Sequence, residues 1–327
     1  MRIIFMGTPE FAVPSLVALL TSDDEVVGVV TQPDRPKGRG QTLTPPPVKV
    51  LAQQHGKSVI QPTKMKDPAL LEALKAWNPD LIVVVAFGRI LPPSILALPP
   101  HGCVNVHGSL LPKYRGAAPI QWAVINGEQE TGITTMLMDE GMDTGAMLLR
   151  EATAIRPDDT SGTLAERLSQ IGARLLIETL RRLKAGQLQP IPQDNARATL
   201  APIIKKEHGV IDWSLSAAAI VNRIRGFTPW PGSSTYLGDE RWTIWRAMVV
   251  PPDASLTAES EPGTFLRGGK DGILVRAGDG VVAVMELQVP GSRRMSAGDF
   301  LAGHRLQPGA RLGGPSKTEH SATSASA

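Results

Sequence analysis

The chain has 327 residues, of which 42% are hydrophobic and 20% charged, and it carries a net charge of +3. This composition is typical of soluble globular proteins, and the length is enough for two domains of ordinary size. The longest apolar run, residues 81–87, is too short to span a bilayer, and a single cysteine excludes an internal disulfide framework.

The compartment is predicted from the same features. Residues 1–5 enter an apolar strand directly, without the apolar core and cleavage site of a secretory leader. One cysteine suits a reducing environment. We therefore expect a cytoplasmic protein that has no membrane partner.

Residues 1–189 predict a doubly wound α/β domain with a parallel sheet. Apolar strands alternate with helical segments, and a continuous apolar run flanked by helices is typical of a central parallel strand. We expect strands over residues 2–6, 25–30, 58–60, 81–87 and 102–107, and helices over residues 10–20, 67–77, 117–126 and 161–185.

The turn after the first strand does not predict dinucleotide binding. Residues 7–12 read Gly-Thr-Pro-Glu-Phe-Ala, with one glycine where the pyrophosphate-binding fingerprint needs three. We therefore expect no nicotinamide cofactor.

The remaining residues predict a linker, a second domain and a tail. Residues 190–206 are polar and proline-bearing, as linkers are, and residues 313–327 are rich in small polar residues and are expected to be disordered. Between them, short strands separated by glycine turns favour a small antiparallel barrel over residues 207–312. We expect a helix over residues 212–225 and strands over residues 234–237, 242–249, 263–266, 272–277 and 281–289.

Chemistry-bearing residues gather where the strand over residues 102–107 ends. Asn105 and His107 share one side of this strand, with α-carbons roughly 7 Å apart, so both side chains can reach one small group. Asp143 follows in a Gly-Met-Asp-Thr-Gly turn. Asn105 or His107 alone is equally well interpreted as an ordinary structural residue. Together with the acidic turn, the two residues favour a catalytic site.

These residues carry a resemblance to a known family. Asn105, His107 and Asp143, with Ser-Leu-Leu-Pro at residues 109–112, resemble the catalytic set of the 10-formyltetrahydrofolate-dependent formyltransferases. The run Ser-Leu-Leu-Pro-Lys-Tyr-Arg-Gly-Ala-Ala-Pro-Ile at residues 109–120 is similar to the branch that formylates methionine carried by initiator tRNA. The resemblance implies a Rossmann-like formyl-transfer domain over residues 1–189 and an OB-like, tRNA-binding domain over residues 207–312.

The resemblance also implies a folate site. Open α/β sheets bind ligands beyond the carboxyl ends of their strands, and the co-substrate 10-formyltetrahydrofolate is expected there. For Phe87 and Leu91, the alternative is an ordinary place in the core. The expected binding residues are Phe87, Gly88, Arg89, Ile90 and Leu91, then Ser109, Leu110, Leu111 and Pro112, and then Asp139, Glu140, Gly141 and Met142.

Direct attack by an amine on the formyl group needs an oxyanion donor and a proton acceptor. The Asn105 amide can donate to the oxyanion, while His107 and Asp143 can move the proton, and which of the two removes it stays open. Cys103, roughly 13 Å along the strand from His107, is interpreted as a packing residue. Because the histidines lack close ligand spacing and no cysteines cluster, no metal is expected.

Residues 31–41, Thr-Gln-Pro-Asp-Arg-Pro-Lys-Gly-Arg-Gly-Gln, form a second distinctive segment. The segment is too polar and too rich in glycine and proline for a helix or strand, and loops this long are commonly functional. Arg39, Arg35 and Lys37 are the expected contacts to charged initiator tRNA, Arg39 being the candidate that the resemblance favours. The alternative is a solvated surface loop. Four tryptophans offer base stacking or a place in the barrel core: Trp213, Trp230, Trp242 and Trp245.

Two other functions compete with formylation of a charged tRNA. A folate enzyme with the same core, acting on a nucleotide or sugar amine, would need neither the basic loop nor the second domain. A tRNA-binding module without catalysis would not need Asn105, His107 and Asp143.

Overall fold

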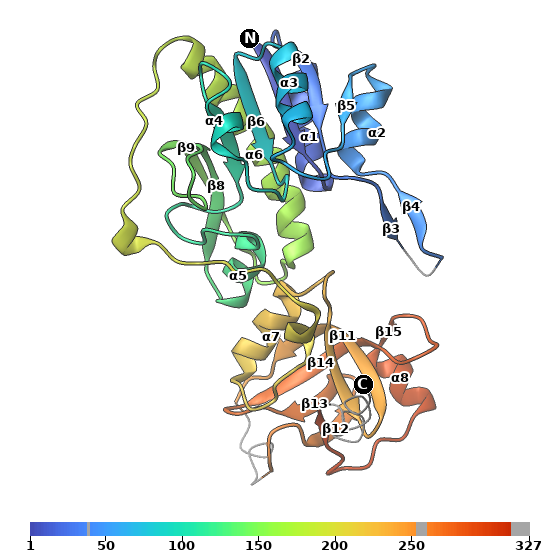
Figure 1. Ribbon diagram of the computed structural model, residues 1–327. Coiled ribbons are helices and arrows are strands. Elements are labelled where there is room, and N and C mark those ends of the chain that lie inside the picture. Colours follow the sequence, from blue (N-terminus) through green and yellow to red (C-terminus); the bar gives the residue numbers. More distant parts are fainter. Residues whose placement is uncertain (38–39, 253–259, 315–327) are drawn as a thin grey trace, which may run out of the picture. The chain divides into compact units, whose positions relative to one another are not determined.

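The structure is a computed structural model that describes residues 1–37, 40–252 and 260–314 (Figure 1). Two compact units make up the chain. Residues 190–203 of the expected linker belong to the first unit, and from residue 315 on the expected disordered tail lies outside the described residues. The first unit contains Met1–Ile120, Gln129–Ile155 and Thr163–Ile203, and the second contains Gln121–Glu128, Arg156–Gly162 and Ile204–Ala327.

The first unit is built on a seven-stranded sheet in the order β5-β2-β1-β6-β7-β8-β9. The five strands from β5 to β7 are parallel, and β8 and β9 run antiparallel at one edge. All five residues of β6 are buried, as expected of a central strand. The bounds are β1 (Arg2–Gly7), β2 (Glu25–Val30), β5 (Val59–Ile60), β6 (Leu81–Val85), β7 (Cys103–His107), β8 (Glu130–Leu137) and β9 (Met147–Ala154).

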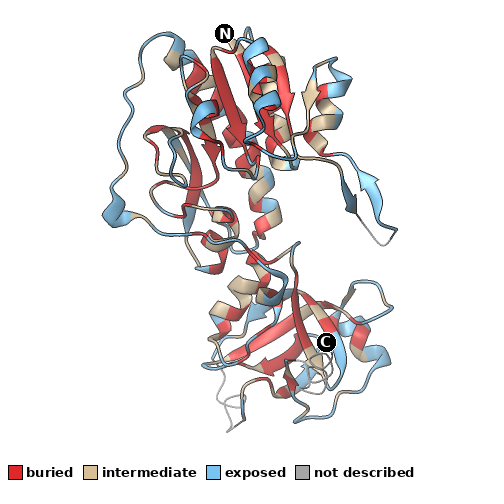
Figure 2. Cartoon of the chain, viewed as in Figure 1, coloured by how far each residue is buried: buried red, intermediate tan, exposed pale blue. Residues whose placement is uncertain are grey.

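Helices surround this sheet (Figure 1), and their solvent-facing sides are exposed while the central strands are buried (Figure 2). The predicted doubly wound α/β fold is confirmed. The antiparallel strands β8 and β9 were not predicted, because their polar and apolar residues lack the continuous apolar run of β6. The helices are η1 (Glu10–Ala12), α1 (Val13–Leu20), α2 (Pro47–Gln54), α3 (Pro68–Ala76), α4 (Pro93–Leu96), α6 (Ser161–Lys184) and η2 (Asn195–Arg197). Most of a further helix, α5 (Pro119–Ile125), belongs to the second unit.

The segment over residues 31–41 was expected to contain no helix or strand, and this expectation is wrong. β3 (Arg35–Lys37) pairs antiparallel with β4 (Thr42–Thr44) to form a short hairpin that extends from the first unit (Figure 1). Residues 38 and 39, between the two strands, lie outside the described residues. The composition of residues 31–41 did not predict these strands because they form by backbone pairing with each other and not by burial of apolar side chains.

The second unit is an antiparallel sheet that closes on itself. Its strand order is β12-β13-β14-β11-β10-β16, with β15 paired to β14. A bridge between Thr264 and Arg311, and a 2.8 Å hydrogen bond from Leu312 N to Gly263 O, join the segments at the two ends of this order. The predicted small antiparallel barrel is confirmed. Its strands are β10 (Ser233–Leu237), β11 (Glu240–Val249), β12 (Phe265–Gly269), β13 (Gly272–Arg276), β14 (Val281–Gln288), β15 (Met295–Ser296) and β16 (Leu312–Gly313).

The helices of the second unit begin at serine caps. Ser216 Oγ accepts from Ala219 N before α7 (Ala217–Gly226), and Ser296 Oγ accepts from Asp299 N before α8 (Ala297–Gly303). A shorter 3-10 helix, η3 (Lys206–Gly209), precedes them. α7 packs on β11 and β14, and its Ile220 and Ile224 enter the core of the barrel.

The tryptophans of the second unit differ in how far they are buried. Trp213 and Trp242 are buried in the barrel core, where the ring of Trp242 meets the Phe300 ring edge-on at 4.9 Å between centroids. Trp230 is 56% exposed. Of these three, Trp230 is the one whose ring is accessible to a base.

Candidate active site

Asn105, His107 and Asp143 come together at the carboxyl end of β7. Asn105 and His107 lie on β7, and Asp143 lies in the loop between β8 and β9. Asn105 Nδ2 donates a long hydrogen bond of 3.4 Å to Asp143 Oδ1, and His107 Nδ1 lies 3.6 Å from Asp143 Oδ2. The carboxylate therefore contacts both strand residues, and the three predicted residues form one cluster.

The His107 ring is buried, with 5% of its surface exposed, and one of its nitrogens forms a hydrogen bond within the protein. Nε2 lies 2.9 Å from the carbonyl oxygen of Tyr114. Since a carbonyl only accepts, Nε2 carries a hydrogen and donates it. His107 can therefore exchange a proton only through Nδ1, the nitrogen that faces Asp143.

The backbone around Asp143 sets the direction of its carboxylate. Asp143 has a φ of 54°, in the left-handed region that Asp and Asn tolerate better than most residues. Its Oδ2 accepts from Gly116 N at 2.8 Å. At Gly145, a Cβ would lie 1.8 Å from the carbonyl oxygen of Leu137, so only glycine fits there. The loop thus holds the carboxylate toward β7.

The predicted folate residues of this loop divide into two groups. Asp139 Oδ1 accepts from Gly141 N at 3.0 Å and from Thr144 Oγ1 at 2.7 Å, so its side chain builds the turn. Glu140 and Met142 are exposed, Met142 by 64%. Asp139 is also exposed, but its side chain is bonded within the turn, so Glu140 and Met142 are the exposed predicted side chains that do not build the turn.

The Ser109–Pro112 segment is held against β8. Ser109 Oγ donates to Lys113 O at 2.6 Å, and Thr134 Oγ1 donates to Ser109 O at 2.7 Å while accepting from Leu111 N at 3.1 Å. The side chains of Ser109 and Leu111 are fully buried, whereas Leu110 and Pro112 are half-buried. A ligand would meet the latter two side chains.

In the segment after β6, a ligand can reach main-chain groups but few of the predicted side chains. Phe87 and Leu91 are buried in the apolar core of the sheet, as the alternative interpretation expected. Gly88 and Ile90 are exposed, and Arg89 is half-buried. Gln32 Nε2 donates to Phe87 O at 2.8 Å and so ties this segment to the base of the β3–β4 hairpin.

The basic residues of the hairpin are only partly described. Arg35 is exposed, and its Nη2 donates to Gln32 Oε1 at 2.6 Å. Lys37 ends β3, and Arg39 lies outside the described residues. Hydrogen bonds from Gln61 and Lys49 lower the pKa of the neighbouring Asp34 carboxyl below its ordinary value. The same hydrogen bonds tie the base of the hairpin to the rest of the unit.

A pocket of about 250 Å³ lies beside this hairpin. Proline rings form much of its wall, and Gln32, Arg35 and Thr44 add polar groups. Its lining residues are Thr8, Pro9, Gln32, Pro33, Arg35, Pro36, Thr44, Pro45, Pro46 and Pro47. Its size suits a small organic group.

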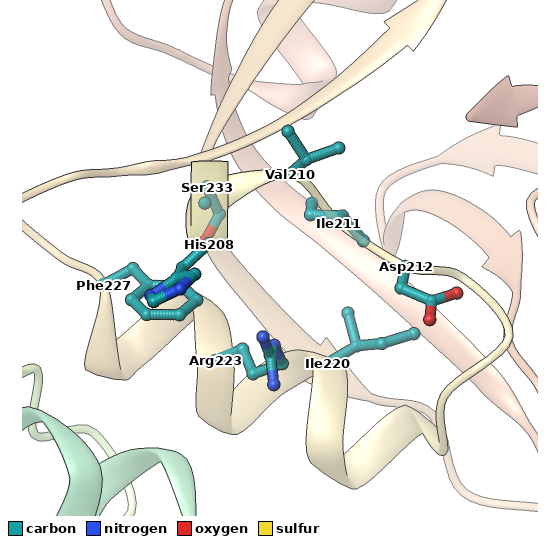
Figure 3. A pocket seen from close by; sticks show the side chains of 9 residues that line it. His208, Val210, Ile211, Asp212, Ile220, Arg223, Phe227 and Ser233 are labelled. Carbon is teal, nitrogen blue, oxygen red and sulfur yellow. The ribbon is translucent and has the colours of Figure 1, made fainter. Parts of the chain in front are cut away.

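A second pocket, in the second unit, is far smaller. Figure 3 shows Ile220, Arg223 and Phe227 along one side of it and Val210, Ile211 and Asp212 along the other. Its volume is about 10 Å³, room for one water molecule. Among the residues that the structure describes, the buried Ser233 hydroxyl at its wall has no hydrogen-bond partner, so a water is the occupant that the pocket fits.

Cys103 is 1% exposed, and its Sγ lies 3.9 Å from the carbonyl oxygens of Ile95 and Leu96. Burial raises the pKa of its thiol to about 12. At pH 8 about one molecule in ten thousand then carries the thiolate that covalent catalysis needs.

We therefore expect Cys103→Ala to keep its turnover and to lose only about 1 kcal/mol of folding stability. Iodoacetamide should modify the native chain much more slowly than the denatured chain. Loss of turnover in a folded Cys103→Ala variant, or a trapped formyl thioester, would contradict the packing role.

In the part of the chain that the structure describes, no group of three or more His, Cys, Asp or Glu side chains is arranged to hold a metal ion. Among the same residues, no helix combines the length and apolarity needed to cross a bilayer.

Several residues of the site escaped the sequence analysis. Arg115 is 7% exposed, and Gln193, Tyr114, Thr134 and Gln32 also bond to the segments described above. A buried arginine requires partners, but the sequence does not show which distant residues supply them.

Comparison with known proteins gives matches along both units. The family described as "Formyl transferase" matches residues 1–180, and "Formyl transferase, C-terminal domain" matches residues 203–305. Methionyl-tRNA formyltransferase of Citrifermentans bemidjiense is 54% identical over 313 residues, which cover 96% of each chain. That of Geobacter sulfurreducens is 52% identical over 320 residues, covering 98% of this chain and 99% of its own.

A solved structure shares the fold at low sequence identity. HypX from Aquifex aeolicus in complex with tetrahydrofolic acid matches with a TM-score of 0.60 and 17% identity, covering 94% of this chain and 49% of its own. With relatives more than half identical along nearly its whole length, and with both family domains in sequence order, the chain belongs to the methionyl-tRNA formyltransferase family.

Proposed function

We propose that this protein transfers the formyl group of 10-formyltetrahydrofolate to the α-amino group of methionine on charged initiator tRNA, in the cytoplasm, and so supports translation initiation. The observation that carries the proposal is the Asp143 carboxylate between Asn105 and His107. The names of the relatives supply the transferred formyl group and the acceptor. The folate donor follows from the resemblance of the site residues to the 10-formyltetrahydrofolate-dependent formyltransferases.

The amine attacks the formyl carbon directly, and the three clustered residues serve that step. Asn105 Nδ2 has two hydrogens, and the one that does not point at Asp143 is available to the oxyanion. The amine proton passes to the Asp143 carboxylate or to His107 Nδ1, and the departing folate nitrogen takes a proton back. Because Nε2 is bonded to Tyr114, the transfer uses the Nδ1 side of the ring.

The two units divide the work. Residues 1–189 bind the folate through the exposed main chain at Gly88 and the accessible side chains among Leu110, Pro112, Glu140 and Met142. Residues 207–312 bind tRNA, and the exposed ring of Trp230 is a surface on which a base can stack. Residues 190–206 link the folate-binding domain to the tRNA-binding domain.

A formylation assay tests the proposal directly. The purified chain is incubated with 10-formyltetrahydrofolate and one of two amines, charged initiator tRNA or glycinamide ribonucleotide. Formyl-methionyl-tRNA is the expected product. Formylation of the ribonucleotide instead, or of neither amine, would overturn the acceptor assignment.

Arg39 and its neighbours should matter for tRNA alone. We expect Arg39→Ala to raise the KM for charged tRNA and to reduce its salt dependence, because one phosphate contact is lost. The affinity for folate should not change. Arg174→Ala, which removes an exposed arginine paired with Glu151 on the sheet, is the matched control and should leave both constants as they are. A tRNA KM that Arg39→Ala does not alter would remove Arg39 from tRNA binding.

A further inference from the structure

The segment after α6 runs beside the catalytic loops of the first unit. Ile191 and Met147 exchange two backbone hydrogen bonds of 2.8 and 2.9 Å. Farther along, Tyr114 N donates to Thr199 Oγ1 at 2.9 Å and Arg115 N donates to Thr199 O at 2.8 Å. This segment was expected to be a linker, yet residues 190–203 are bonded to the unit at both ends.

One side chain of this segment spans two catalytic loops. Gln193 Nε2 donates to Asp143 O and to Gly145 O, each at 2.8 Å, which uses both of its hydrogens. Gln193 Oε1 accepts from Arg115 Nε at 3.0 Å. The amide therefore bonds the Asp143 loop through its nitrogen and the Arg115 loop through its oxygen.

The Arg115 loop in turn contacts the two acid-base residues. The carbonyl of Tyr114 accepts from His107 Nε2, and Gly116 N donates to Asp143 Oδ2. Arg115 itself is 7% exposed, and its Nη2 donates to Asn195 Oδ1 at 2.9 Å. A movement of this loop would therefore change the distance between His107 and Asp143.

We propose that Gln193 is a positioning residue for formyl transfer. It holds the main chain at Asp143 and Gly145, so that the carboxylate stays between Asn105 and His107. Displacement of a catalytic group by about 1 Å can cost about a hundredfold in rate. The inference rests on the proposed function, because it assigns Gln193 to the same reaction.

The test uses the full chain and three variants. Gln193→Ala removes all three hydrogen bonds. Gln193→Glu keeps the shape and the acceptor for Arg115 but places one carboxylate oxygen against the carbonyls of Asp143 and Gly145. Gln189→Ala removes an exposed glutamine four residues earlier in the same segment and serves as the control.

We expect kcat to fall about 10- to 100-fold in Gln193→Ala and at least as much in Gln193→Glu, with the KM for 10-formyltetrahydrofolate unchanged. Gln189→Ala should keep the kcat of the wild type. Wild-type kcat in Gln193→Glu would overturn the proposal, since that variant retains only the contact with Arg115. If the alanine variant fails to fold, the glutamate variant, which has the same shape, decides.

A double variant shows whether Gln193 acts through Asp143. In the Asp143→Asn background, Gln193→Ala should lower kcat much less than it does in the wild type, because the group that it positions has lost its function. Equal losses in both backgrounds would overturn the positioning role. Failure of the wild-type chain itself to formylate charged tRNA would instead overturn the proposed function.

Discussion

Asp143→Asn should lower kcat for formyl transfer by roughly two to four orders of magnitude if the carboxylate beside His107 takes part in moving the amine proton. Asparagine tolerates the left-handed backbone at this position, where φ is 54°, and its amide oxygen can still accept from Gly116 N. The variant therefore keeps the loop and removes the charge. Steady-state kinetics with charged initiator tRNA measures the loss.

Thermal unfolding and folate binding provide the controls for this variant. The melting temperature and the folate Kd should stay close to those of the wild type, since the loop geometry is preserved. His107→Gln should show a loss of similar size. A folded Asp143→Asn chain with the wild-type kcat would exclude the carboxylate from proton transfer.

Asn105→Ala should cost about 2.7–4 kcal/mol of transition-state stabilisation, roughly a hundred- to a thousandfold in kcat, if its amide donates to the oxyanion. Asn105 lies on β7 and is half-buried, so truncation removes the donor without opening the core. The KM for folate should change little, because the oxyanion develops only during the reaction.

Asn105→Asp is the informative companion to the alanine variant. It keeps the shape of the side chain but cannot donate, and it places a second carboxylate beside Asp143. We expect it to be at least as inactive as the alanine variant. A kcat for Asn105→Ala within a few fold of the wild type would show that another group stabilises the oxyanion.

The strongest sequence signals were local ones. The apolar run over residues 81–87 predicted the central strand, of which residues 81–85 form β6, and alternation along β7 predicted that Asn105 and His107 share a side. Both follow from the periodicity of a single strand. The barrel strands β10 to β14 were predicted for the same reason, from short apolar segments between glycine turns, whereas the two-residue strands β15 and β16 were not predicted.

Other features depend on contacts between distant residues, which no local pattern reports. Gln193 lies 50 residues from Asp143, and its sequence neighbours Pro192 and Asp194 are exposed. Six consecutive residues of β8 are buried although polar and apolar residues are mixed in its sequence, and this burial depends on the pairing of β8 with β7 and β9. Burial of the Phe87 side chain likewise depends on the strands and helices packed around it.

The buried state of Cys103 has a practical consequence for spectroscopy. It is the single cysteine of the chain, and its raised thiol pKa makes it slow to react with maleimides at neutral pH. A cysteine introduced at Leu43, which is 66% exposed on β4, would then be the fast-reacting thiol. One fluorophore attached there would report movement of the β3–β4 hairpin when tRNA binds, in a chain that keeps all its native residues but one.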